Sequence, residues 1–248
     1  MLASQFVFHL ALQRDKVESF DRYPFNLPAI RSLDERLELH PKVTFFVGEN
    51  GSGKSTLLEA LAVSLGFNAE GGSRNFNFGT RASHSVLHEY LRVAKGVKRW
   101  RDGYFLRAES FFNVATEIER LDEGPGGASV ISAYGGRSLH EQSHGESFLK
   151  LLNERFGGRG LYLLDEPEAA LSPQRQLDAL VRMHELVRQG SQFVMATHSP
   201  ILMAYPDAWV YRFDADGIQR VAVHDTAHHR VMREFMADPR AVLDRLLP

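Results

Sequence analysis

Apolar runs and turn-forming residues alternate along the chain and divide it into short strands and longer helices. Continuous apolar runs indicate strands buried in a sheet, and apolar positions spaced by three or four residues indicate helices. The runs predict strands over 5–12, 27–33, 43–47, 103–109, 159–166 and 191–197. The spacing predicts helices over 54–66, 84–95, 145–156 and 174–189. A DG turn predicts a hairpin over 209–223, and the tail from about Thr226 is predicted to be helical.

Strands that alternate with helices in this order predict a doubly wound α/β fold, with a mainly parallel sheet and an antiparallel β part. Two glycine-rich stretches interrupt the order, at 66–83 and 122–138, and we expect partner contacts there. We expect one domain over 1–248, with an inserted helical subdomain at about 110–157. Ligands in such sheets bind at the carboxyl ends of the strands.

The composition excludes some classes of function. The 248 residues carry 29 Lys and Arg against 31 Asp and Glu, so the formal charge of −2 gives no overall attraction to nucleic acid or anionic membranes. The absence of cysteine excludes disulfides and thiolate metal sites. No apolar run reaches the roughly 18 residues that span a bilayer, and the N-terminus is a poor signal peptide. We therefore expect a cytoplasmic protein without membrane insertion.

Residues 48–55, GENGSGKS, fit the phosphate-loop (Walker A) pattern G-x-x-x-x-G-K-[ST] between a predicted strand and a predicted helix. Glycines let backbone N–H groups surround phosphate oxygens, and the helix adds its positive N-terminal end. Lys54 is expected to reach the β- and γ-phosphates, and the Ser55 hydroxyl is expected to ligate Mg²⁺. The pattern predicts a P-loop nucleoside-triphosphate site that contains Gly48, Asn50, Gly51, Ser52, Gly53, Lys54, Ser55 and Thr56.

Two acids and one histidine end other buried strands. Asp165, after LYLL, is expected to hold Mg²⁺, and Glu166 is expected to be the general base that polarises the attacking water. His198 ends the strand in QFVMATHSP, and its imidazole could contact the γ-phosphate or orient that water. These residues predict hydrolysis of the bound nucleotide.

The stretch SHGES, which begins at Ser143, opens a predicted helix. Taken alone it is an ordinary N-cap, in which the Ser143 hydroxyl and the Gly145 N–H would face an anion. In chain order, however, the phosphate loop, SHGES, the paired acids and the later histidine resemble the ATP-binding-cassette class of ATPases, over essentially the whole chain. In that class a signature motif usually written LSGGQ completes the ATP site of a facing subunit. The resemblance implies that role for Ser143, Gly145 and Glu146.

Three departures from the class pattern matter. His144 replaces the first glycine of the signature. Residues 71–141 contain no Gln, so Glu109, or as a second choice Asn113, is expected to take the place of the glutamine that helps to ligate Mg²⁺. Ser172 stands where transporter subunits usually have Asp. Together with ATHSPIL, this last departure makes the chain resemble stand-alone RecF-like and OLD-like AAA-type ATPases more than transporter subunits.

The resemblance implies an ATPase that binds Mg-ATP, closes as a head-to-tail homodimer around two ATPs and acts as a conformational switch. Three alternatives stay open: the energising subunit of a transporter, a DNA- or RNA-associated ATPase in repair or phage defence, and an ATP-gated module with negligible turnover. The protein partner stays unidentified, and the choice of adenine rests on the resemblance.

Three further features have both a functional and a structural interpretation. The basic stretch at 91–101 could bind a nucleic-acid backbone, but a solvated face is favoured. The histidines of VHDTAHHR could hold a metal only on a helix, and surface histidines are favoured. Tyr23 and Phe25 could stack on adenine or pack in the core.

Overall fold

A computed structural model describes residues 5–33, 36–73, 85–108, 116, 119–120 and 144–247, and for His144 and Gly145 it describes the backbone alone. Three expected site residues, Glu109, Asn113 and Ser143, lie outside the described residues. The same holds for most of the expected inserted subdomain and for much of the two glycine-rich loops.

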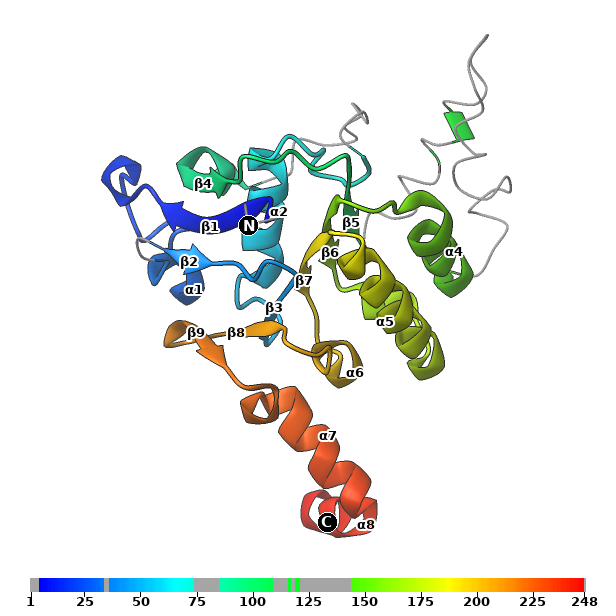
Figure 1. The fold of residues 1–248 in the computed structure, drawn as a ribbon. Coiled ribbons are helices and arrows are strands. Elements are labelled where there is room, and N and C mark those ends of the chain that lie inside the picture. The colour runs from blue at the N-terminus through cyan, green and yellow to red at the C-terminus, as the bar shows by residue number, and fades with distance from the viewer. Residues whose placement is uncertain are drawn as a thin grey trace.

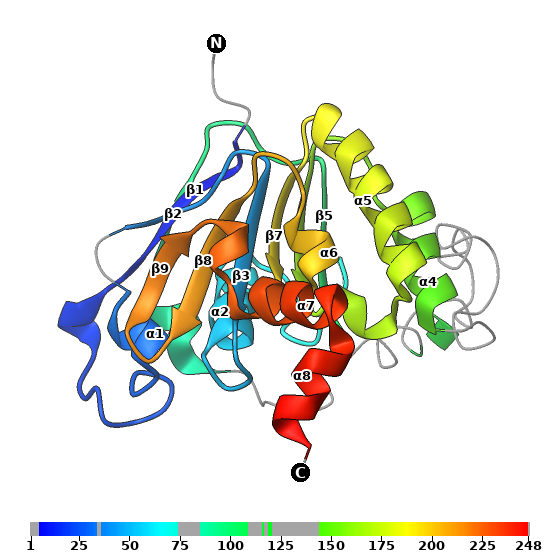
Figure 2. The same cartoon turned by 90° about the horizontal axis from the view of Figure 1, so that it is seen from below.

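The larger of two sheets carries the predicted parallel core. Its strand order is β5-β6-β7-β3-β8-β9, and all neighbours are parallel except the hairpin partners β8 and β9 (Figure 2). Apolar residues fill β3, β6 and β7 almost continuously because helices cover both faces of this sheet. The strands are β3 (Val43–Gly48), β5 (Asp102–Arg107), β6 (Gly160–Asp165), β7 (Gln192–Ala196), β8 (Trp209–Asp214) and β9 (Gly217–Val221). This architecture confirms the predicted mainly parallel α/β fold with an antiparallel part.

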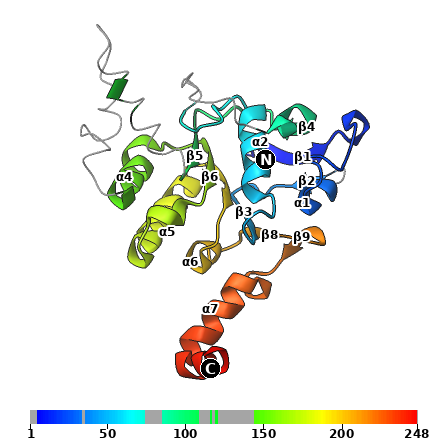
Figure 3. The same cartoon turned by 180° about the vertical axis from the view of Figure 1, so that it is seen from behind.

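The smaller sheet is antiparallel and has the order β2-β1-β4, from β1 (Val7–Leu12), β2 (Leu37–Glu38) and β4 (Leu91–Lys95). Helix α2 (Lys54–Ser64) lies between the two sheets (Figure 3). Its Leu57, Leu58 and Leu61 are fully buried and share one core with Leu10 of β1 and Phe46 of β3. The helix that follows the phosphate loop is therefore packed against both sheets.

The other face of the larger sheet is covered by α4 (His144–Lys150), a π-helical turn (Leu151–Arg155), α5 (Pro173–Arg188) and α6 (Pro200–Met203). Alternate residues of each strand supply the two cores, since side chains of a strand point to opposite faces in turn. Phe45 and Leu164 face this layer, whereas Phe46 and Leu163 face α2.

Two predicted elements are wrong. Residues 27–33 hold the short helix α1 (Pro28–Arg31) instead of a strand, since Pro28 suits the first helical position and Ala29 and Ile30 are buried in the α2-side core. Residues 84–95 hold a 3₁₀ turn (Val86–Tyr90) followed by β4 instead of a helix. Pairing of Leu91–Lys95 with β1 overrides the helical spacing.

The predicted helical tail is confirmed as α7 (Ala227–Ala237) and α8 (Pro239–Leu246), which extend away from the sheets (Figure 1). The side chain of Thr226 caps α7 by accepting the N–H of His229. No residue of either helix is buried, and several apolar side chains on them are exposed. In the described part of the chain, no helix is long and apolar enough to cross a membrane.

Candidate active site

The phosphate loop joins β3 to α2 and depends on glycine at two positions. Gly48 ends β3, where a Cβ atom would lie 2.2 Å from the Phe213 carbonyl oxygen of the neighbouring strand β8. Gly53 has a left-handed φ of 98° immediately before α2. The sequence pattern thus places a tight loop at the carboxyl end of a buried strand, as predicted.

Lys54 lies buried inside this loop. Its Nζ donates hydrogen bonds of 2.9 Å to the carbonyl oxygens of Gly48 and Glu49. Burial lowers the pKa of Lys54, although the nearby carboxylates of Glu166 and Asp165 act in the opposite direction. The hydroxyl oxygen of Ser52 is also buried and has no hydrogen-bond partner among the described residues. A buried ammonium and an unsatisfied hydroxyl in one loop fit the oxygens of a bound phosphate.

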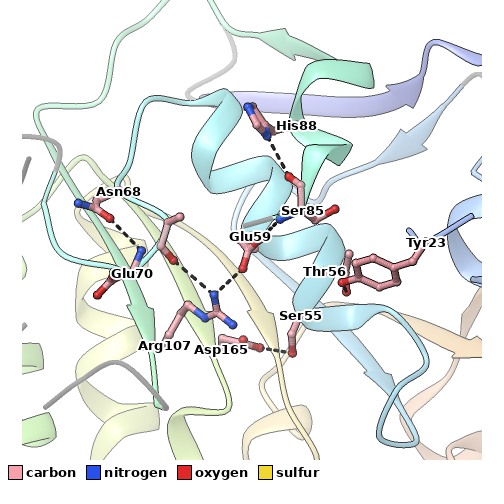
Figure 4. A network of polar contacts seen from close by, with 11 residues as sticks. Tyr23, Ser55, Thr56, Glu59, Asn68, Glu70, Ser85, His88, Arg107 and Asp165 are labelled. Atoms are coloured by element: carbon pink, nitrogen blue, oxygen red, sulfur yellow. Dashed lines mark hydrogen bonds and ion pairs between the residues drawn. The ribbon is translucent and has the colours of Figure 1, made fainter. Parts of the chain in front are cut away.

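Ser55 and Asp165 meet across the sheet. The Ser55 hydroxyl donates a 2.8 Å hydrogen bond to Asp165 Oδ1, although 110 positions separate the two residues (Figure 4). They come together because β3 and β6 both flank β7 in parallel, so their carboxyl ends share one edge. Hydroxyl and carboxylate oxygens are ligands that Mg²⁺ prefers. The pair therefore fits the expected metal position.

Glu166 adopts a left-handed backbone, with φ of 50° and ψ of 49°. Its N–H donates to the carbonyl oxygen of Ala196 at the end of β7. Its Oε1 lies 3.5 Å from Nε2 of His198. The two predicted catalytic residues are thus adjacent, at the same sheet edge as Ser55 and Asp165.

His228 of α7 completes this group and was not predicted to belong to it. Its Nε2 lies 2.9 Å from Nδ1 of His198. Burial, followed by the charge of Lys54 and by His228, lowers the pKa of His198, and burial also lowers the pKa of His228. Both shifts favour the neutral form of the imidazole rings. Of the histidines interpreted as surface residues, His228 is half-buried against His198, whereas the side chain of His224 is 70% exposed.

Glu168 is a second residue that the sequence interpretation missed. It follows Glu166 by two positions in DEPE, and its Oε1 accepts the backbone N–H of His198. Burial raises the pKa of the Glu168 carboxyl group, against the opposing effect of that hydrogen bond. Glu168 thus fixes the backbone of the histidine whose ring faces Glu166, and its place in a run of acids was the available signal.

The signature residues are only partly described. Gly145 and Glu146 lie in the first turn of α4, and a carboxylate oxygen of Glu146 lies 3.5 Å from a guanidinium nitrogen of Arg175 on α5. Ser172, the third departure, caps α5 by accepting the N–H of Arg175. The unusual serine therefore has a structural role.

Two residues before Glu109, the end of β5 is fixed by a buried ion pair. Arg107 donates to Glu59 of α2, and Glu59 also accepts the backbone N–H of Ser85 at 3.0 Å (Figure 4). The strand that leads to the expected glutamine position is thus tied to the phosphate-loop helix. The sequence gives no sign of this pair.

Tyr23 and Phe25, the two candidate adenine contacts, differ in their exposure. Phe25 is buried and packs edge-on against Tyr90 and Phe20, so its interpretation as an adenine contact is wrong. Tyr23 is 61% exposed, and its hydroxyl lies 3.3 Å from the Thr56 hydroxyl at the start of α2 (Figure 4). Its ring is therefore available next to the phosphate loop.

The histidine metal site receives no support, because the described residues contain no group of three or more His, Asp or Glu arranged to hold a metal ion.

Two AAA-domain families match the chain. Residues 26–132 match a profile described as an AAA domain. Residues 138–204 match a second AAA-domain profile, whose description names the AbiEii toxin of type IV toxin–antitoxin systems.

Three curated proteins are similar to parts of the chain, and the name of one of them includes ATP binding. The chain is 27% identical over 172 residues to ABC transporter G family member STR2 of Medicago truncatula, covering 64% of this chain and 24% of that protein. It is 28% identical over 184 residues to the hemin import ATP-binding protein HmuV of Idiomarina loihiensis, covering 68% and 70%. A segment of 25 residues is 72% identical to the DNA replication and repair protein RecF of Colwellia psychrerythraea, covering 10% and 7%. The chain thus spans about a quarter of STR2 and a small part of RecF.

A solved ATP-binding cassette of an ABC transporter, in its ADP conformation, has the same fold. The TM-score is 0.50 at 18% identity, over 98% of this chain and 100% of that one. The short RecF match agrees with the expected RecF-like resemblance. The motifs, the strand order and these similarities support an AAA-type P-loop ATPase with the fold of an ATP-binding cassette.

Proposed function

We propose that the chain binds Mg-ATP, hydrolyses it, and closes head-to-tail with a second copy around two ATPs. The observation that carries this proposal is the meeting of Ser55 and Asp165 beside the buried Lys54, with Glu166 and His198 at the same sheet edge. The ATP-binding name of the hemin-import relative supports the choice of nucleotide.

Each of these side chains has a defined task in the proposal. Lys54 exchanges the two carbonyl oxygens that it now contacts for phosphate oxygens, and the Ser52 hydroxyl donates to the same group. Ser55 and Asp165 hold Mg²⁺, which neutralises phosphate charge when bound. Glu166 accepts a proton from the attacking water, and His198 orients that water or the γ-phosphate.

His228 acts through His198 as a positioning residue. A neutral imidazole carries one N–H, so the two rings can share one hydrogen bond only if one donates and the other accepts. If His228 Nε2–H donates to His198 Nδ1, the N–H of His198 is on Nε2, on the side of Glu166. This arrangement keeps a donor directed at the reacting groups.

The proposed dimer would bring Ser143, Gly145 and Glu146 of one copy to the nucleotide of the other. A positive helix start suits an anion, and these residues open α4. The ion pair between Glu146 and Arg175 of the same chain would have to open before Glu146 could contact a nucleotide.

Light-scattering mass of the Glu166→Gln variant, with and without Mg-ATP, tests the proposal. The substitution keeps ATP binding and stalls hydrolysis, so a dimer should accumulate with ATP and should disappear when Ser143→Arg is added. A monomer at saturating ATP, with hydrolysis intact in the unmodified chain, would overturn the dimer alone. Absence of both ATP binding and hydrolysis in the unmodified chain would overturn the whole proposal.

A further inference from the structure

Six cationic residues gather at the amino ends of β5, β6 and β7, at the sheet edge opposite the phosphate loop. Arg101 and Arg159 directly precede β5 and β6, and Arg188 ends α5 shortly before β7. The sequence interpretation included only the stretch at 91–101, and the fold adds two arginines from distant segments. We call this set the basic surface; it consists of Lys95, Lys98, Arg99, Arg101, Arg159 and Arg188.

The basic surface is concave. Two hollows, of about 500 and 510 Å³, adjoin the loop that joins β4 to β5, and Lys98 and Arg99 of this loop line both. The described residues that line them include no acid. The chain as a whole has more acids than cations, so the two signs of charge are segregated at this edge. Cations in concave surroundings of this kind concentrate the field and attract anions.

The cations have no acidic partner among the described residues, and Lys95 Nζ donates one 3.5 Å hydrogen bond, to the Ser64 carbonyl oxygen. Among the described residues none of the six forms an ion pair, whereas Arg155, Arg182 and Arg212 each do. Backbone hydrogen bonds join the segments: Arg101 N–H donates to the Arg159 carbonyl, and Arg159 N–H donates to the Gln189 carbonyl. The surface is therefore preformed, which lowers the entropic cost of binding.

The surrounding apolar groups indicate which polyanion fits. Proteins that bind single strands stack bases on exposed aromatic rings. Here Phe6 is buried and Trp100 is half-buried, so the described aromatic residues that line the hollows offer at most one ring to a base, not the several rings that a single strand stacks on. Membrane binding relies on an apolar face beside the cations, and Val97, 94% exposed, is a single side chain. These observations favour recognition of backbone phosphates by the cations over stacking of bases or insertion into a membrane.

We propose that the basic surface binds the phosphate backbone of double-stranded nucleic acid, with Lys98 and Arg99, which line both hollows, at the centre of the contact. Such binding is independent of sequence and weakens steeply with salt. It lies away from the phosphate loop and does not require ATP hydrolysis.

Fluorescence anisotropy of a short labelled DNA duplex, titrated without ATP over a series of salt concentrations, tests this proposal. The triple variant Lys98→Gln, Arg99→Gln, Arg101→Gln should bind the duplex about tenfold more weakly or worse, and each lost phosphate contact should reduce the log–log salt slope by about 0.9. A control with the same loss of charge is Arg230→Gln, Arg233→Gln, Arg240→Gln on α7 and α8, which should bind as the unmodified chain does.

Equal weakening in both triple variants, or no binding by the unmodified chain, would overturn the proposal. Tighter binding of the matching single strand, or of vesicles rich in anionic lipid, would assign the surface to that ligand instead. Lys54→Ala should keep full duplex binding, so a failure of the ATPase proposal would be distinguishable from a failure of this one.

Discussion

His228 Nε2 lies 2.9 Å from His198 Nδ1, so a helix outside both sheets contacts the histidine at the end of β7. Loss of one such hydrogen bond costs about 1.4 kcal/mol, which corresponds to tenfold in rate. We therefore expect His228→Leu to lower the kcat for ATP hydrolysis about tenfold, with little change in KM.

His228→Gln should restore most of that kcat, because the glutamine amide offers an N–H at similar reach. His224→Gln, a change of the same kind at an exposed histidine, serves as the control. Steady-state kinetics of the three variants test whether His228 positions His198. If His228→Leu has normal kcat, or if Gln rescues nothing, the positioning role is excluded.

Tyr23 should contribute to nucleotide affinity through its exposed ring. Stacking of an aromatic pair contributes about 0.5–1.5 kcal/mol, so Tyr23→Ala should weaken ATP binding roughly two- to tenfold. Tyr23→Phe should bind like the unmodified chain if the ring matters, and like Tyr23→Ala if the hydroxyl near Thr56 matters. Titration with a fluorescent ATP analogue distinguishes these outcomes.

The ion pair between Glu59 and Arg107 should be strongly coupled. Both side chains are largely buried, at 9% and 20% exposure, so Glu59→Leu removes the carboxylate that the Arg107 guanidinium contacts in this setting. Breaking such a pair costs about 3–5 kcal/mol, whereas replacing both partners by apolar residues is often close to neutral. Urea unfolding of Glu59→Leu, Arg107→Met and the double variant measures the coupling. Additive single effects would show that the pair contributes little.

Glu168 should make stability depend on pH. Because burial raises the pKa of Glu168 in the folded state, the folded chain binds more protons than the unfolded chain at pH values above the ordinary Glu range. The contribution of Glu168 to the free energy of unfolding is therefore greatest at acid pH and falls as pH rises through the raised pKa. Glu168→Gln cannot ionise and keeps an acceptor for the His198 N–H.

The thermal midpoint of Glu168→Gln should accordingly exceed that of the unmodified chain at pH 7, with a gap that closes toward pH 4. Glu154→Gln, at an exposed glutamate, is the control and should show no such gap. An equal midpoint shift at both pH values would mean that ionisation of Glu168 is not the cause.

Continuous apolar runs predicted the strands of the larger sheet correctly, because a strand covered on both faces is apolar at nearly every position. The two wrong predictions of secondary structure lie where tertiary contacts outweigh the local sequence pattern. Leu91–Lys95 forms a strand because it pairs with β1. Pro28–Arg31 forms a helix because Ala29 and Ile30 pack into the core on the α2 side of the larger sheet. Local spacing carries neither piece of information.

For the site, the motifs predicted which side chains gather at the strand ends, since parallel strands place their carboxyl ends together. They did not predict His228, because no local pattern links α7 to β7 across 30 positions. Nor could they predict the six-residue basic surface, of which Arg159 and Arg188 join only through the fold.

The C-terminal helices have a thermodynamic consequence. Since no residue of α7 or α8 is buried, detaching them from the domain exposes little apolar surface and costs far less than global unfolding. Their amide hydrogens should therefore exchange with solvent much faster than those of β3 or β7. The contact between His198 and His228 would break whenever α7 detaches, so the proposed role of His228 would link ATP hydrolysis to the docking of the C-terminal helices.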